Sequence, residues 1–136
     1  MKSALTALLC AAMLAAGCSD PAPPPAPTPV TPTVLETFSG TLLVAGANSH
    51  PFTISKIGGV KVSLTSLAGG AAVGLGVGTP STTSGTCLVI NGMTAVAGAS
   101  VQISGTATVV GNYCVSVADV GNLVEPVTYT ITVNHS

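Results

Sequence analysis

The sequence is poor in charged side chains, which make up 5% of its 136 residues. Ordinary domains carry about 25%. After the first 17 residues the only lysines or arginines are Lys56 and Lys61, against four carboxylates. Because nucleic-acid binding needs many clustered cations to neutralise phosphates, this shortage excludes a nucleic-acid-binding protein. It also excludes long-range electrostatic steering of a partner.

Aromatic side chains are equally scarce, at 3% of the chain with no tryptophan. Sandwich domains that bind carbohydrate usually stack sugar rings on exposed aromatic side chains. Here the aromatic residues alternate along the chain with polar ones and share a face with apolar neighbours, so core packing is predicted for all four: Phe38, Phe52, Tyr113 and Tyr129. The core must otherwise consist of Val, Ile, Leu and Ala.

The first 17 residues have the layout of a secretory signal peptide. Lys2 supplies a positive charge, and residues 4–16 form an apolar stretch of roughly a dozen residues that is too short to span a bilayer. The segment Leu14-Ala15-Ala16-Gly17-Cys18 resembles the bacterial lipobox, although its leucine lies one residue further from the cysteine than usual. The resemblance implies removal of residues 1–17 and lipid attachment to Cys18. The alternative is ordinary cleavage nearby and a freely secreted protein.

Residues 18–33 predict a stalk between this lipid and the domain. Seven of the ten prolines fall in this segment. Proline cannot donate ladder or helix hydrogen bonds and favours polyproline II, which at about 3.1 Å per residue would give a spacer some 40–50 Å long. A ligand for proline-recognising modules is the alternative. Ser19 follows the cysteine, and by resemblance to enterobacterial sorting this favours the outer membrane of the bacterial cell envelope.

Two cysteines remain for the exported domain. Cys10 lies in the signal peptide and Cys18 is the proposed lipid site, which leaves Cys87 and Cys114. Because an exported protein meets an oxidising compartment, a disulfide between them is predicted. A reactive thiol pair or a metal site is the alternative.

Residues 34–136 read as one all-β domain. Val127, Tyr129, Ile131 and Val133 alternate with polar residues, the period of a strand with one apolar face, and nothing in this part of the chain has helical periodicity. About eight strands are predicted: 36–45, 50–57, 60–67, 72–78, 86–91, 100–109, 112–118 and 127–134. Short, regular strands with glycine turns predict an antiparallel β-sandwich.

The run from Val73 to Gly78 alternates valine or leucine with glycine. Its spacing does not match a dinucleotide-binding fingerprint. Alternation places the large side chains in the core and leaves a bare face at Gly74, Gly76 and Gly78. Such a face suits either close approach of another backbone or a flat strand edge that accepts a strand from a second chain, so self-association is one hypothesis.

The strand patterns resemble those of the bacterial pre-peptidase C-terminal domain family. The matching segments are 36–42, 50–54, 59–65, 111–115 and 127–133. This resemblance implies a jelly-roll-like sandwich that accompanies secreted enzymes or surface proteins, is not catalytic, and in some relatives binds calcium or an insoluble polymer.

The loop before the last strand holds the calcium candidates Asp119, Asn122 and Glu125. They supply part of the six to eight oxygens that calcium needs. The alternative is that Asp119 caps an Asx-type turn and Glu125 is simply exposed. The two histidines, His50 and His135, are 85 residues apart, and His50 is expected to be exposed at the start of a strand.

No catalytic motif is present, so an enzyme is not expected. We expect a non-catalytic lipoprotein that is attached to the membrane through its lipid and acts as a surface or periplasmic binding or structural module. The expected partner is a protein or a polysaccharide. No cofactor is expected, with calcium as the alternative. The alternatives are a self-associating subunit that pairs through a strand edge and a calcium-stabilised accessory module of a secreted enzyme system.

Overall fold

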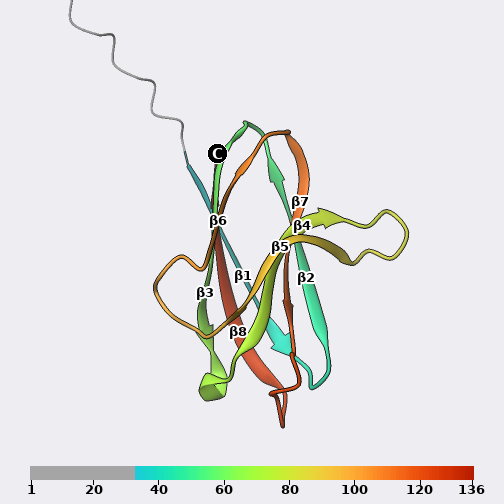
Figure 1. Cartoon of the computed structure of the whole chain (residues 1–136), viewed down its shortest axis with the longest axis vertical. Coiled ribbons are helices and arrows are strands. Elements are labelled where there is room, and N and C mark those ends of the chain that lie inside the picture. The colour runs from blue at the N-terminus through green and yellow to red at the C-terminus, as the bar shows by residue number, and fades with distance from the viewer. Residues whose placement is uncertain (1–32) are drawn as a thin grey trace, which may run out of the picture.

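The computed structural model describes residues 33–136, which form a sandwich of strands (Figure 1). The predicted signal peptide, Cys18 and the proline-rich segment up to Pro32 lie outside the described residues. No helix within residues 33–136 is long and apolar enough to cross a membrane.

The eight predicted strands are all present, with ends that differ by a few residues. They are β1 (Val34–Leu42), β2 (Ala47–Ile54), β3 (Gly58–Leu67), β4 (Val73–Pro80), β5 (Cys87–Ala95), β6 (Ile103–Ala107), β7 (Gly111–Ala118) and β8 (Val127–His135). A single 3₁₀ turn, η1 (Ala68–Gly70), is the helical element of the described chain. The all-β prediction is therefore confirmed. The main differences are that β5 is longer than predicted and β6 is shorter.

The strands form two antiparallel sheets of four, in the orders β1-β8-β3-β6 and β2-β7-β4-β5. This is the strand order of a jelly roll, in which most connections cross from one sheet to the other. β1 lies beside β2 along one side of the sandwich, and β5 lies beside β6 along the opposite side. The four edge strands are thus grouped as two pairs, one on each side of the sandwich.

The core between the sheets is aliphatic, as the composition predicts. Its largest fully buried side chains are Leu42, Ile54, Leu64, Leu75 and Ile131. Two of the aromatic residues, Phe52 and Tyr129, are buried, and the other two, Phe38 and Tyr113, pack at its margin.

Alternation with Phe38 and Leu42 predicts that Val44 shares their inward face. The structure shows that it does not. It is 47% exposed because β1 ends at Leu42 and the chain turns there. The Gly46 N–H donates to the Leu43 carbonyl at 2.9 Å, and Ala45 has a φ of 55°.

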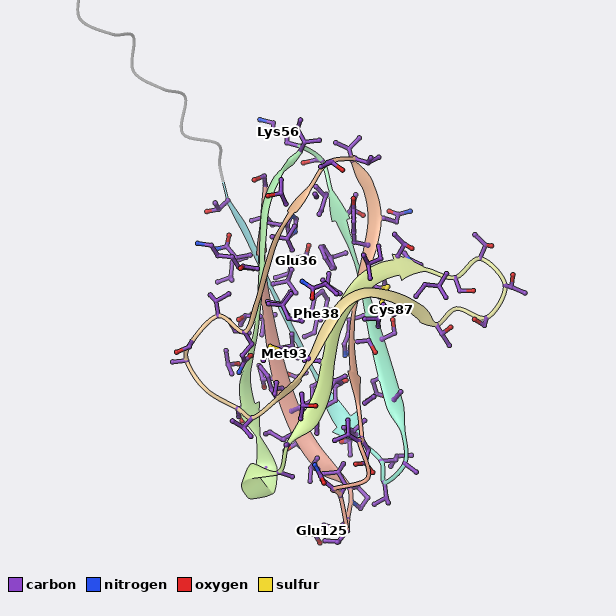
Figure 2. All side chains as sticks on the ribbon, viewed as in Figure 1. Glu36, Phe38, Lys56, Cys87, Met93 and Glu125 are labelled. Atoms are coloured by element: carbon purple, nitrogen blue, oxygen red, sulfur yellow. A yellow bond between two sulfur atoms is a disulfide. The ribbon has the colours of Figure 1, made fainter. Side chains whose placement is uncertain are left out.

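The predicted disulfide is present, with Cys87 of β5 bonded to Cys114 of β7 (Figure 2). These strands are not neighbours, because β4 lies between them. Adjacent strands are about 4.8 Å apart, so two strands separated by a third stand about 9.6 Å apart in a flat sheet. The two Cα atoms are only 5.7 Å apart. At this end β5 must therefore curl toward β7 over the outward face of β4.

Candidate functional site

The glycines of β4 do not form an open edge. β4 is paired with β5 over its whole length and with β7 from Gly74 to Gly78. The predicted interaction edge at Gly74, Gly76 and Gly78 is therefore wrong. Alternation shows which face of a strand is bare, but it does not show whether the strand lies inside the sheet.

The second interpretation of these glycines, close approach of another backbone, is confirmed at Gly78, whereas Gly76 makes room for a side chain. A Cβ atom at Gly76 would lie 2.7 Å from a methyl group of Val89. A Cβ atom at Gly78 would overlap the carbonyl group of Leu88. The bare face of β4 is therefore covered by β5, and this packing is what allows Cys87 to reach Cys114.

Asp119 accepts hydrogen bonds from four backbone N–H groups. Its Oδ1 atom is 2.8, 2.9 and 3.2 Å from the nitrogens of Gly121, Asn122 and Leu123, and its Oδ2 atom is 2.8 Å from the nitrogen of Ala45. The hydrogen bond from Ala45 and those within the loop hold the pKa of the carboxyl below its usual value, against a smaller opposing effect of desolvation. Asp119 thus joins the β1–β2 turn to the loop before β8.

The calcium candidates do not converge. The side-chain nitrogen of Asn122 donates to the Ala72 carbonyl at 3.2 Å, and Glu125 is exposed at the tip of the loop (Figure 2). The four N–H groups around Asp119 point their positive ends at its carboxylate, and these positive ends would repel a cation there. Within the described chain no group of three or more His, Cys, Asp or Glu side chains is placed to hold a metal ion.

The prediction that His50 is exposed at the start of a strand, made from its place before Pro51, is wrong. His50 is half-buried in β2, and its ring stacks on Phe38 with centroids 5.1 Å apart. Its Nε2 atom lies 2.6 Å from the hydroxyl of Tyr129 on the other sheet, and Asn48 donates to the same hydroxyl at 3.1 Å.

These contacts favour a neutral His50. The side-chain nitrogen of Asn48, the atom that contacts this hydroxyl, can only donate, so the Tyr129 hydroxyl accepts from it and its own proton can point to Nε2 of His50. Burial lowers the pKa of His50, which also favours the neutral ring. Gly40 makes room for the arrangement, since a Cβ atom there would lie 2.7 Å from the tyrosine hydroxyl.

His135 forms a separate contact on the same side of the sandwich. It is 2% exposed, and its Nε2 atom lies 2.8 Å from Oε1 of Glu36 on β1. Among the described hydrogen bonds, neither imidazole contacts the side chain of a serine or cysteine. His50 therefore ties β2 to β8 of the other sheet, and His135 ties β8 to β1.

The opposite side of the sandwich carries an apolar groove of about 330 Å³ between β5 and β6. Its lining includes the side chains of Val77, Ile90, Ile103, Ala107 and Tyr113. The hydroxyl of Tyr113 donates to the Val109 carbonyl at 2.7 Å, so this ring is held in place at the margin of the core. The groove is bordered by two strands that each have one unpaired edge.

β5 is the less protected of these two edges. Apart from Asn91 and Thr94 its exposed side chains are apolar, with exposed fractions of 57% for Leu88, 51% for Val89, 74% for Ile90 and 44% for Met93. Edge strands normally carry charges or proline, or are very short. β5 has nine residues with no charge and no proline, and its one irregularity is the register shift against β4 at Ile90, whereas β1 carries Glu36, β2 carries Pro51 and β6 has only five residues.

This surface was missed from the sequence, where 86–91 reads as a short apolar run without clear sidedness. That lack of sidedness was itself the signal. A strand inside an antiparallel sheet with one solvated face alternates, whereas β5 bears apolar side chains that stay exposed.

No protein-family model matches the chain, and no curated protein is significantly similar to it in sequence.

Proposed function

We propose that the protein is a non-catalytic, lipid-anchored module of the bacterial cell envelope that binds an extended polypeptide segment along β5. The observation that carries this proposal is the uncharged, apolar edge of β5 beside a groove between the sheets. A bound strand would gain main-chain hydrogen bonds from the edge and bury alternate side chains against the groove.

The position of the stalk agrees with this role. β1 begins at Val34, directly after the proline-rich segment, and lies on the β1/β2 side of the sandwich. An anchor attached there leaves the β5/β6 side free. The lipobox-like segment around Cys18 and the resemblance to pre-peptidase C-terminal domains favour the same kind of exported accessory module.

The chemistry of the groove favours a polypeptide over a polysaccharide. Its aromatic residue, Tyr113, is only partly exposed and its hydroxyl already bonds the backbone, so it is not a platform for stacking sugars. The missing charge on β5 selects for a partner strand that is itself uncharged.

The binding proposal is tested with an end-blocked peptide of alternating valine and threonine, titrated against the full acylated chain in detergent. We expect saturable binding that Ile90→Lys weakens by about tenfold or more, because it places a charge at the groove and on the edge. Val124→Lys adds the same charge at a site that is 95% exposed and far from β5 along the chain, and should bind as the parent does. Equal binding by all three proteins, or by none at concentrations where the parent is a monomer, would contradict the proposal.

The anchoring proposal is tested by intact mass on protein extracted from bacterial membranes. We expect the mass of residues 18–136 with added acyl chains, and two hydrogens fewer before reduction than after. Cys18→Ser should move the protein out of the membrane fraction. An unacylated parent in the soluble fraction would show a secreted module instead.

A further inference from the structure

We infer that the strand bound at β5 is β5 of a second copy of this chain, paired antiparallel about Asn91. This inference rests on the proposed function and names the partner. Asn91 is the middle residue of the nine that form β5 (Cys87–Ala95). A two-fold axis at Asn91 therefore pairs the whole strand with itself.

The register about Asn91 brings no bulky side chains into conflict. Ile90 lies opposite Gly92 of the second copy, which leaves it room. Val89 and Met93 stand opposite each other but on different faces, because the ladder to β4 skips Ile90: Val89 covers Gly76 on the outer face, and Met93 is paired with Leu75, which faces the core. The two asparagines face each other, and each amide can both donate and accept.

The absence of charge matters most for self-pairing. A two-fold axis brings every charge near its own copy, and like charges directly opposite destabilise a strand pair. β5 has none. β1 offers an acidic residue, Glu36, whose carboxylate already contacts His135. β2 has Pro51 at its centre, which cannot donate a ladder hydrogen bond.

Pairing through β5 also limits the assembly to two copies. It joins the two β2-β7-β4-β5 sheets into one sheet of eight strands whose outer edges are both β2. Because β2 carries Pro51, growth stops at two copies. We therefore expect a dimer and no filament.

Antiparallel pairing places the two stalks at opposite ends of the dimer. A nine-residue strand is about 30 Å long, and the predicted stalk of some 40–50 Å exceeds this length. Two copies anchored in one membrane can therefore reach this arrangement.

The register is tested by Asn91→Cys in the full chain, after gentle oxidation in detergent. Directly opposed residues in an antiparallel pair have Cα atoms about 4.5–5.5 Å apart, within the range that a disulfide spans. We expect a reducible covalent dimer. Thr53→Cys is the matched control, because Thr53 is exposed on the other edge strand of the same sheet, and should form no covalent dimer. Intact mass confirms that the Cys87–Cys114 bond is kept.

Sedimentation tests the association without an added thiol. The parent and Val124→Lys should form dimers as concentration rises, while Ile90→Lys should remain a monomer with an unchanged circular dichroism spectrum. Ile90 is 74% exposed, so the substitution does not disturb the core.

A monomeric parent that still binds the valine–threonine peptide at β5 would overturn self-pairing and leave the proposed function standing. A monomeric parent that binds no peptide would overturn both. Crosslinking of Thr53→Cys as efficient as that of Asn91→Cys would also overturn the pairing, because it would show that collision in the micelle produces the dimer.

Discussion

At the scale of single residues, Asp119 does the most to shape one end of the sandwich. Its carboxylate holds N–H groups from two segments that are 74 residues apart, Ala45 and the loop that follows Asp119 itself. Its own N–H group donates to the Gly46 carbonyl at 2.9 Å. One side chain therefore fixes how the β1–β2 turn sits against the loop before β8.

We predict that Asp119→Asn lowers the melting temperature by the same amount with calcium and with a chelator. An asparagine amide in this position cannot accept all four N–H groups, because its nitrogen is a donor. Glu125→Gln, in the same loop but exposed, should melt like the parent. A calcium-dependent rise in the melting temperature that Asp119→Asn abolishes would contradict this and indicate a metal site.

Asp119 also makes the stability of the domain fall as the pH is lowered. Because the folded state lowers the pKa of Asp119, its contribution to stability is fully present above the usual value of about 3.9 and is lost as pH falls toward the folded pKa. Thermal unfolding followed from neutral pH to below pH 3 should therefore show a smaller acid loss in Asp119→Asn than in the parent.

Sequence reasoning reached some of these residues and missed others for physical reasons. The disulfide was predictable because only one pair of cysteines remained in a domain that the sequence predicts to be exported. The Asx-type role of Asp119 was an open alternative, since turn chemistry is local. His50 was placed wrongly because its partner, Tyr129, lies 79 residues away on the opposite sheet. No local pattern records such a contact.

At the scale of elements, the packing of β5 over β4 depends on glycine. The carbonyl group of Leu88 occupies the space that a side chain at Gly78 would fill. Val89 likewise covers Gly76. A side chain at Gly78 or Gly76 would therefore push β5 away from β4 at this end of the hairpin.

We predict that Gly78→Ala destabilises the domain by about 1–3 kcal/mol, the usual cost of forcing an extra carbon into a packed site. Gly105→Ala is the control, because Gly105 lies in β6 with no atom within 4 Å of its Cβ position. It should change the free energy of unfolding by less than about 0.5 kcal/mol. Urea unfolding measures both, and a Gly78→Ala variant as stable as the parent would show that β5 does not cross β4 there.

Most of the elements were predictable because the period of two in apolar residues is a local property. Which strands become edges was not. The pairing of β4 depends on β7, about forty residues further along the chain, and the exposed edge of β5 depends on β6 joining the other sheet. The predicted edge was therefore assigned to the wrong one of two adjacent strands.

At the scale of the whole molecule, the disulfide ties β5 to β7 through a loop with a sequence separation of 27. That loop contains β6 and its connections, so the bond limits the unfolded chain across both sheets. In the chain-entropy account, a loop of this length contributes roughly 3.5 kcal/mol.

The double variant Cys87→Ala/Cys114→Ala should lower the free energy of unfolding by about 3.5 kcal/mol. The measurement is urea unfolding under oxidising conditions. A reductant should destabilise the parent by a similar amount and leave the double variant unchanged. A loss below about 1 kcal/mol would mean that the unfolded chain already keeps this loop compact.

The fold class of the whole molecule was within reach of the sequence, since short regular strands and a lack of helical periodicity admit few other architectures. The groove beside β5 was not. It exists because β6 has only five residues and covers less of the core than the strand facing it, and a difference in strand length between two sheets is a property of the assembled sandwich.

The pairing of β1 has a mechanical consequence. All nine residues of β1 are paired in register with β8, from Val34 opposite His135 to Leu42 opposite Val127. A pull on the segment before Val34, directed along β1, loads these nine pairs together in shear and does not open them one at a time from the end. The domain is thus built to bear tension at Val34, the place where the predicted stalk would join it.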